Sequence, residues 1–402
     1  MTSSEPGVLP EDPIRQLLRE SHLLSADQVA PTVAARAADL GFLETVIYLA
    51  DYEQVSLLPL PGSGVPPRQE LSIEGTVAGL AYRRMELAHT DRPGSGHHLW
   101  LSLVDGAERL GVIELRVETA TAAVEDEARI LASLVAELIV VNDLYSDFFS
   151  RLRRRKVMTL AAEIQWDLLP PLTFATDRVV IAGALEPAYE IGGDTFDYAV
   201  TNDTADLLVL DSVGHGLASA LLSSAAVGAY RHARRSQLDL PEISQAMNTV
   251  IAQQFGASQF ATAAIVRLDL DTGQLRWVNA GHPAPLILRR GSLIHLPACL
   301  PARPLGLQSG KPLECETRLQ PGDQVLLYTD GIVEARSPTG EFFGEERLAD
   351  FILRAAAAGD PAPETIRRLM RHVLVHQADQ LQDDASIVLL EWRTGRELHL
   401  LE

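Results

Sequence analysis

The sequence predicts an α+β protein, and the order of its strands and helices supports that class. Short apolar strands dominate the chain from Arg178 onward, and tight turns such as the one at Asp271–Gly273 join neighbouring strands into hairpins. Four predicted helices accompany these strands, at 217–236, 241–255, 346–357 and 363–377. Antiparallel sheets covered by pairs of helices favour a layered α–β–β–α sandwich.

The length of the chain predicts its number of domains, and its charge limits the classes of ligand that it can bind. At 402 residues the chain is too long for one typical domain, and two or three domains are expected. Its 54 acidic and 34 basic residues give a net charge of −20. This balance argues against a general nucleic-acid binder, which needs a basic surface for the phosphate backbone. It suits a protein that binds divalent cations or a basic partner.

The sequence also predicts a cytoplasmic protein without a membrane segment. The N-terminus lacks the basic and apolar regions of a signal peptide. No apolar stretch reaches the roughly 18–20 residues that a membrane-spanning helix needs. Cys299 and Cys315 have neither metal-site nor catalytic spacing, so we expect reduced cysteines without a role.

The N-terminal part divides into a tail with a short helix (1–24) and a predicted domain (25–142). That domain reads as helix, hairpin, loop, helix, paired strands and long helix, an order that resembles the GAF family of signalling-input domains. The resemblance implies an unknown small molecule or protein as input, whereas a sheet wrapped by helices without any ligand is the alternative. His97 and His98 are expected in a solvated loop.

A linker at 143–172 follows, with apolar residues at every third or fourth position. This spacing predicts a long amphipathic helix that could transmit a signal and form a homodimer through 143–168. Its basic run RLRRRK is interpreted as a solvated helix face and not as a nucleic-acid site. The rest of the chain, 173–402, is predicted to be the catalytic domain.

Four aspartates lie at predicted strand ends, most of them beside glycines: Asp194 (IGGD), Asp211 (DSVGHG), Asp330 (YTDG) and Asp383 (DDAS). Carboxylates are preferred ligands of Mg²⁺ and Mn²⁺, and two such ions can activate a water for attack on phosphorus. No Cys-x5-Arg loop or Gly-x-Ser-x-Gly elbow offers a protein nucleophile instead. The pattern therefore predicts a metal-centred hydrolase, with Asp197 and Asp203 interpreted as turn residues.

Six blocks in this order carry a more specific resemblance: IGGD, DSVGHG, FATAAIVRLDLDTGQLRWVNAGHPAPLI, PLGL, PGDQVLLYTDGIVEAR and DDASIVLL. Over about 175–392 the chain resembles the SpoIIE-like branch of the PPM metal-dependent serine/threonine protein phosphatases. The resemblance implies that it hydrolyses phosphoserine or phosphothreonine on a protein, with two Mn²⁺ or Mg²⁺ ions.

The resemblance also implies a role for each ligand. Asp211 would bridge the two ions, and the backbone carbonyl of Ser212 would contact one of them. Asp330 and Asp383 would complete the shell of one ion, and Asp194 would hold the other directly or through water.

Three further residues have roles that the sequence leaves less defined. Asp384 would support the ligands from behind. His215 is either a proton donor to the leaving serine oxygen or an ordinary turn histidine. His282, in AGHP, is expected to shape the fold.

Relatives of this architecture imply a substrate as well: a phosphorylated anti-sigma-factor antagonist in bacterial partner-switching. Two other interpretations remain. A catalytically inactive phosphatase fold would only bind or scaffold partners, although the intact aspartate set argues against it. A two-metal nuclease would mix histidine with carboxylate ligands and need a basic footprint, which a chain of charge −20 lacks.

Overall fold

The computed structural model divides the chain into two compact units, 1–155 and 156–402, which are described separately. The single boundary at 155 differs from the expected boundaries at 142 and 172. The first eleven residues of the expected tail lie outside the described part. The structure describes residues 12–92, 96–106, 108–190, 192–256, 258–294, 296, 299–378 and 381–393.

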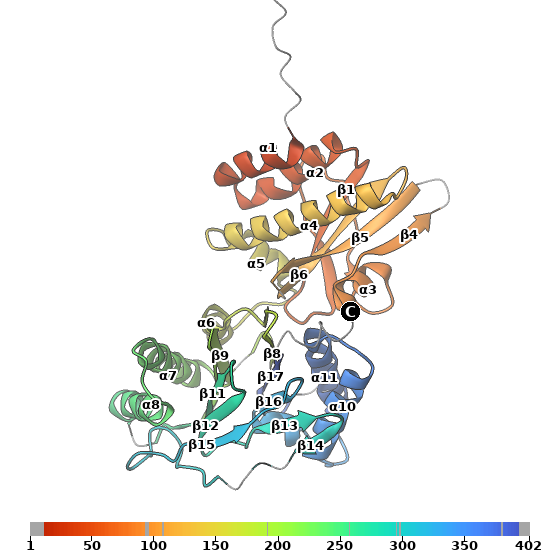
Figure 1. Cartoon of the computed structure of the whole chain (residues 1–402). Helices are drawn as coiled ribbons and strands as arrows, with labels where there is room; N and C mark the ends of the chain where they lie inside the picture. Colours follow the sequence, from red (N-terminus) through yellow and green to blue (C-terminus); the bar gives the residue numbers. More distant parts are fainter. Residues whose placement is uncertain are drawn as a thin grey trace, which may run out of the picture. The chain divides into compact units, whose positions relative to one another are not determined.

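The first unit is built on a six-stranded antiparallel sheet in the order β3-β2-β1-β6-β5-β4. Figure 1 labels β1, β4, β5 and β6 of this sheet. Apolar residues alternate along β1, so that Ile47 and Leu49 face one side and Val46 and Tyr48 the other. Its strands are β1 (Glu44–Ala50), β2 (Ser56–Pro59), β3 (Leu71–Ser72), β4 (Ala88–Arg92), β5 (Gly96–Asp105) and β6 (Glu108–Val117).

Helices cover both faces of this sheet. Leu17 and Phe149 lie in the core on one face, together with residues of α2 and α4, while α3 packs on the other face. Residues 13–24 therefore belong to the domain and not to a separate tail. The helices are α1 (Pro13–Glu20), α2 (Val29–Asp39), α3 (Val77–Arg84), α4 (Ala122–Asp143) and α5 (Phe148–Arg153), with 3₁₀ turns at Ser21–Leu23 and Ala26–Gln28.

The expectation that His98 lies in a solvated loop is wrong. His98 lies on β5 and is buried, and its Nδ1 is 2.8 Å from Oε1 of the buried Glu114. Strand periodicity places His98 on the same face as Trp100, under α3.

The linker is not one long helix, which corrects the expectation for 143–172. Helix α4 ends at Asp143, α5 is short, and α6 (Leu160–Leu168) is a separate helix in the second unit. Two features account for the breaks, one a contact with the core and the other a local cap. Phe149 is anchored in the core of the first unit, and the Thr159 hydroxyl accepts a hydrogen bond from the Ala162 N–H and so starts α6 anew.

The second unit contains two antiparallel sheets. One has the order β15-β12-β11-β10-β9 and the other β14-β13-β16-β17-β8-β7. The strands are β7 (Thr173–Ala175), β8 (Val179–Glu186), β9 (Thr195–Val200), β10 (Thr204–Ser212), β11 (Ala261–Asp269), β12 (Gln274–Ala280), β13 (Leu286–Arg289), β14 (Ser292–Ile294), β15 (Cys315–Arg318), β16 (Gln324–Tyr328) and β17 (Ala385–Trp392).

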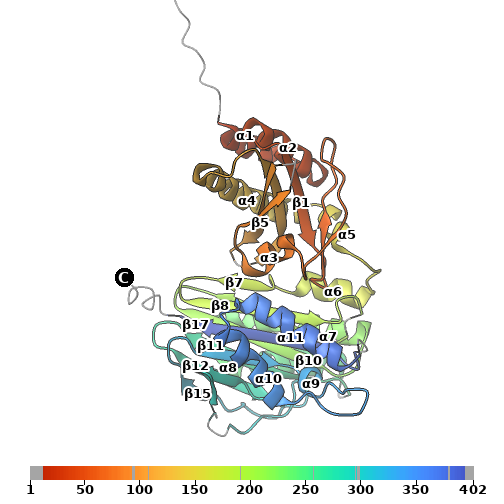
Figure 2. The same ribbon diagram turned by 90° about the vertical axis from the view of Figure 1, so that its right-hand side faces the viewer.

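Two pairs of helices flank these sheets, and Figure 1 shows the pairs on opposite sides of the strands. Apolar residues of α7 and α8 share a core with β10, β11 and β12, and those of α10 and α11 share one with β16 and β17. Between the sheets, the Phe196 ring of β9 lies directly against Gly183 of β8. The predicted α+β class is confirmed. The helices are α7 (Leu217–Arg235), α8 (Leu240–Phe255), α9 (Asp330–Val333), α10 (Glu345–Ala357) and α11 (Ala362–His376), and Figure 2 gives a second view.

The expectation of reduced cysteines is wrong, because Cys299 and Cys315 form a disulfide. Strand β15 begins at Cys315, opposite Trp277 of β12, and the segment that precedes it returns to the same edge. The two cysteines are 16 positions apart in the sequence, and their spacing alone did not indicate that they lie close together. Among the described residues, no helix is long and apolar enough to cross a bilayer.

Candidate metal centre

Asp194 and Asp211 lie opposite each other on neighbouring strands. Strands β9 and β10 pair with Leu210 opposite Thr195, so the antiparallel register carries Asp211 to the position opposite Asp194. Asp194 is buried, whereas Asp211 is only partly buried. Ser212 follows Asp211 and is also buried.

Asp330 and the pair Asp383–Asp384 meet at one end of the other sheet. Tyr328, the last residue of β16, is paired with Ile387, so Asp330 follows the end of β16 where β17 begins. Asp383 and Asp384 immediately precede β17. Asp330 and Asp383 are exposed and Asp384 is partly buried.

The buried Thr329 connects the two sheets at this point. Its Oγ1 donates a hydrogen bond to Oδ2 of Asp194 at 2.6 Å and accepts one from the Ser386 N–H at 2.9 Å. Because the Thr329 side chain is fully buried, it fixes one oxygen of Asp194. Sequence reasoning did not identify Thr329, although its place beside Asp330 in YTDG was the available signal.

Asp384 holds the glycine loop that precedes Asp194. Its Oδ2 accepts hydrogen bonds from the N–H groups of Gly192 and Gly193, each at 2.7 Å. A Cβ at Gly331 would lie 1.9 Å from the Asp384 carbonyl oxygen, so the TDG turn requires glycine for this close approach. Asp384 therefore fixes the loop that leads into Asp194, and its role behind the metal ligands stays a prediction.

A serine cluster holds the same loop from the other side. The Ser223 hydroxyl of α7 donates to the Gly193 carbonyl at 2.6 Å and lies 3.1 Å from the Ser212 hydroxyl. A Cβ at Gly193 would lie 2.4 Å from both oxygens of Ser212, which explains the second glycine of the motif. Ser223 was also missed, and nothing in its alanine- and serine-rich context marks it.

Burial and mutual repulsion raise the proton affinity of these carboxyls. Burial, followed by the charge of Asp211, raises the pKa of Asp194 well above its usual range. Burial and the charges of Asp330 and Asp383 raise the pKa of Asp211 to about 7. Burial also raises the pKa of Asp330 and that of Asp384.

Other buried aspartates of this unit show what is unusual about the cluster. Asp197, Asp206 and Asp323 each form an ion pair with arginine, with shortest N–O distances of 2.8, 2.7 and 2.6 Å. Asp197 lies within β9, so its interpretation as a turn residue is wrong. Within the described ranges, no arginine or lysine forms an ion pair with any of the five site aspartates: Asp194, Asp211, Asp330, Asp383 and Asp384.

This arrangement fits a cation. Buried carboxylates are ordinarily paired with a positive charge or coordinate a metal, and oxygen-only donors suit Mg²⁺ or Mn²⁺. The fit is not tight: in the described part of the chain, no three acidic, histidine or cysteine side chains converge closely enough to qualify as a metal site. The aspartates thus form a loose cluster across two strand ends.

His215 lies on the turn after Ser212, exposed to solvent. Its backbone lies close to Gly192, since a Cβ there would meet the His215 Cα at 3.3 Å. His282 is buried and its Nδ1 is 2.7 Å from the Thr262 hydroxyl, which is consistent with a role in shaping the fold.

A family model and two relatives of known name are similar to parts of this chain. The model of the family "Stage II sporulation protein E (SpoIIE)" matches residues 201–393, a stretch that includes Asp211, Asp330 and Asp383 and begins just after Asp194. Phosphoserine phosphatase RsbU of Bacillus subtilis (strain 168) is 23% identical over 232 residues, which are 58% of this chain and 68% of that protein. Phosphoserine phosphatase RsbP of the same organism is 25% identical over 206 residues, half of each chain.

A solved structure, the SiaA-PP2C domain of Pseudomonas aeruginosa, is 24% identical, with a TM-score of 0.49, and covers 58% of this chain and 94% of that one. The family match and the predicted motifs coincide on the second unit. Over residues 201–393, in the second unit, the chain matches the SpoIIE family of PPM phosphatase domains.

Proposed function

We propose that this chain is a cytoplasmic, metal-dependent protein serine/threonine phosphatase. The observation that carries the proposal is the cluster of five aspartates without arginine or lysine partners, in a unit whose other buried aspartates have them. The two antiparallel sheets, each packed against a pair of helices, support it too.

Two Mn²⁺ or Mg²⁺ ions would be held by Asp194, Asp211, the Ser212 carbonyl, Asp330 and Asp383. When bound, such ions supply Lewis acidity toward a phosphate ester and a nucleophile derived from water. The protein's own part is to hold the ligands. Thr329 fixes Asp194, and Asp384 fixes the loop before it.

The substrate would be a phosphoprotein. Asp330, Asp383 and His215 are exposed, so the site is open to a phosphorylated segment of another protein. RsbU and RsbP are named phosphoserine phosphatases, which supports phosphoserine as the substrate class. We propose that a regulatory protein, such as an anti-sigma-factor antagonist, carries it. His215, whose backbone lies beside Gly192 of the glycine loop, is the candidate proton donor to the leaving serine oxygen.

We further propose that the first unit is a GAF-like sensor that controls the second. Its six-stranded antiparallel sheet with helices on both faces supports this assignment. The homodimer is proposed through α4, because the continuous linker helix expected at 143–168 is broken. Ile130 and Val141 are exposed and lie eleven residues apart on one face of α4, and the exposed Leu144 directly follows the end of the helix.

The activity is tested by hydrolysis of p-nitrophenyl phosphate with and without Mn²⁺. We expect Mn²⁺-dependent turnover that Asp211→Asn abolishes. Asp203→Asn is the matched control and should leave turnover unchanged, because Asp203 lies on an exposed turn. Equal inactivity of wild type and both variants with Mn²⁺, on this ester and on a phosphoserine peptide, would favour the scaffold interpretation.

A second experiment tests control by the first unit. A chain without residues 1–155 should hydrolyse the same ester at a changed basal rate and lose the dimer. If both rate and oligomeric state stay the same, the relay through α4 is refuted.

A further inference from the structure

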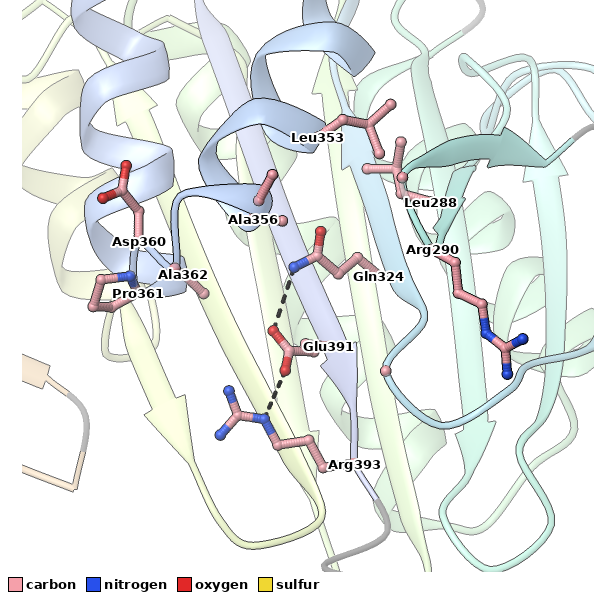
Figure 3. A pocket seen from close by; sticks show the side chains of 14 residues that line it. Leu288, Arg290, Gln324, Leu353, Ala356, Asp360, Pro361, Ala362, Glu391 and Arg393 are labelled. Carbon is pink, nitrogen blue, oxygen red and sulfur yellow. Dashed lines mark hydrogen bonds and ion pairs between the residues drawn. The ribbon is translucent and has the colours of Figure 1, made fainter. Parts of the chain in front are cut away.

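The second unit contains a cavity of about 650 Å³ that is separate from the aspartate cluster. It lies between the β13–β14 hairpin, the ends of β16 and β17 and the turn from α10 to α11 (Figure 3). Strand β16 begins at the cavity with Gln324 and leads to Asp330 at the other end. Six residues of extended chain separate the two sites by ~20 Å.

Both carboxylates that line the cavity are already neutralised. One oxygen of Glu391 accepts a hydrogen bond from Nε2 of Gln324 at 3.3 Å, and the other from Nε of Arg393 at 2.7 Å. Figure 3 shows this chain of contacts across the floor of the cavity. Asp360 is paired with Arg368. The carboxylates therefore have no free charge for a cationic ligand.

Arg290 supplies the uncompensated charge. It lines the cavity, is exposed, and has no hydrogen bond or ion pair among the described residues. Its backbone is left-handed (φ 46°), followed by Gly291 (φ 79°), in a two-residue hairpin turn where asparagine and glycine are the favoured residues. The left-handed backbone conformation is unfavourable for arginine, and the Arg290 guanidinium has no partner among the described residues. Together these two features indicate that Arg290 has a role in binding.

The other part of the lining is apolar. Leu288 is buried, and Leu353 and Ala356 of α10 extend the same surface. In Figure 3 these three side chains lie together at one end of the cavity, and Arg290 and Arg393 lie toward the other. Small-molecule sites commonly have volumes of about 300–1,000 Å³ and combine an apolar wall with a few placed polar groups.

We propose that this cavity binds a small amphipathic anion. Its apolar body packs on Leu288, Leu353 and Ala356, and its carboxylate or phosphate head pairs with Arg290. The site is independent of the phosphatase proposal, because it shares no residue with the aspartate cluster and the binding is measurable without metal.

The experiment is calorimetric titration of the full chain, in metal-free buffer, with decanoate as the amphipathic probe. We expect saturable binding of decanoate and none of inorganic phosphate at the same concentration. Arg290→Ala should weaken binding about tenfold, as expected for the loss of a charged hydrogen bond. Arg235→Ala is the matched control, since Arg235 is exposed on α7 and lies outside the cavity.

A second pair of variants tests the apolar wall. Ala356→Trp should fill the cavity and abolish binding, whereas Ala358→Trp places the same side chain on an exposed residue that does not line it. Circular dichroism checks that each variant folds. Three results would overturn the proposal: no saturable binding to the wild type, equal binding to wild type, Arg290→Ala and Ala356→Trp, or equal binding of inorganic phosphate.

Discussion

Replacing Thr329 with valine is the sharpest test of how the structure prepares Asp194. The substitution keeps the size of the side chain but removes the hydroxyl that donates to Asp194 Oδ2 at 2.6 Å. That hydrogen bond holds down a pKa that burial raises, so its loss raises the pKa of Asp194 further. A cation must then displace a more tightly held proton.

The magnitude follows from the type of hydrogen bond. A bond to a charged acceptor contributes about 1.5–3 kcal/mol, and 1.4 kcal/mol corresponds to a factor of ten in an equilibrium constant. We therefore expect Thr329→Val to raise the Mn²⁺ concentration for half-maximal p-nitrophenyl phosphate hydrolysis by about 10- to 100-fold. The difference from wild type should shrink as pH rises, because deprotonation of Asp194 then costs less.

Thr329→Ser is the matched control, because it retains both the donor to Asp194 and the acceptor for the Ser386 N–H. It should need nearly the wild-type Mn²⁺ concentration. The same requirement in wild type and Thr329→Val would refute the reasoning. An equal defect in both variants would assign the effect to the lost methyl group and not to the hydroxyl.

Three further predictions concern stability and assembly. Burial lowers the pKa of His282 from 6.5 to about 4, so the neutral form favours the fold. The contribution of His282 to the free energy of unfolding should fall by ~3 kcal/mol between pH 6.5 and 4, so in urea titrations the wild type should lose about that much more stability over this range than His282→Gln. Under oxidising conditions Cys315→Ser should lower the free energy of unfolding by about 3 kcal/mol, because the disulfide, which joins residues 16 positions apart, restricts the conformations of the unfolded chain. Dithiothreitol should remove that difference, and its persistence would assign the effect to packing. Val141→Glu combined with Leu144→Glu should convert a dimer to a monomer in light scattering, and a monomeric wild type would contradict the α4 interface.

The second unit was predictable because its signals are local. Alternating apolar residues and two-residue turns specify antiparallel hairpins, and the GGD, TDG and DDAS blocks place Asp194, Asp330 and Asp383 at strand ends. Each of these features depends on a few consecutive residues. Errors arose where a distant contact overrides the local pattern, as when Phe149 enters the core of the first unit and interrupts the predicted linker helix.

The sequence by itself determined the family, the candidate ligands and the α+β class. Only the tertiary structure decided which atoms hold those ligands. Thr329 and Asp194 are 135 positions apart, and Asp384 and the glycine loop 192, so no periodicity could link them. The same holds for the Cys299–Cys315 disulfide and for the cavity at Arg290, which appear only once the strands are paired. Side chains meet through strand register and sheet packing, and both are set by burial of the whole core and not by any single segment.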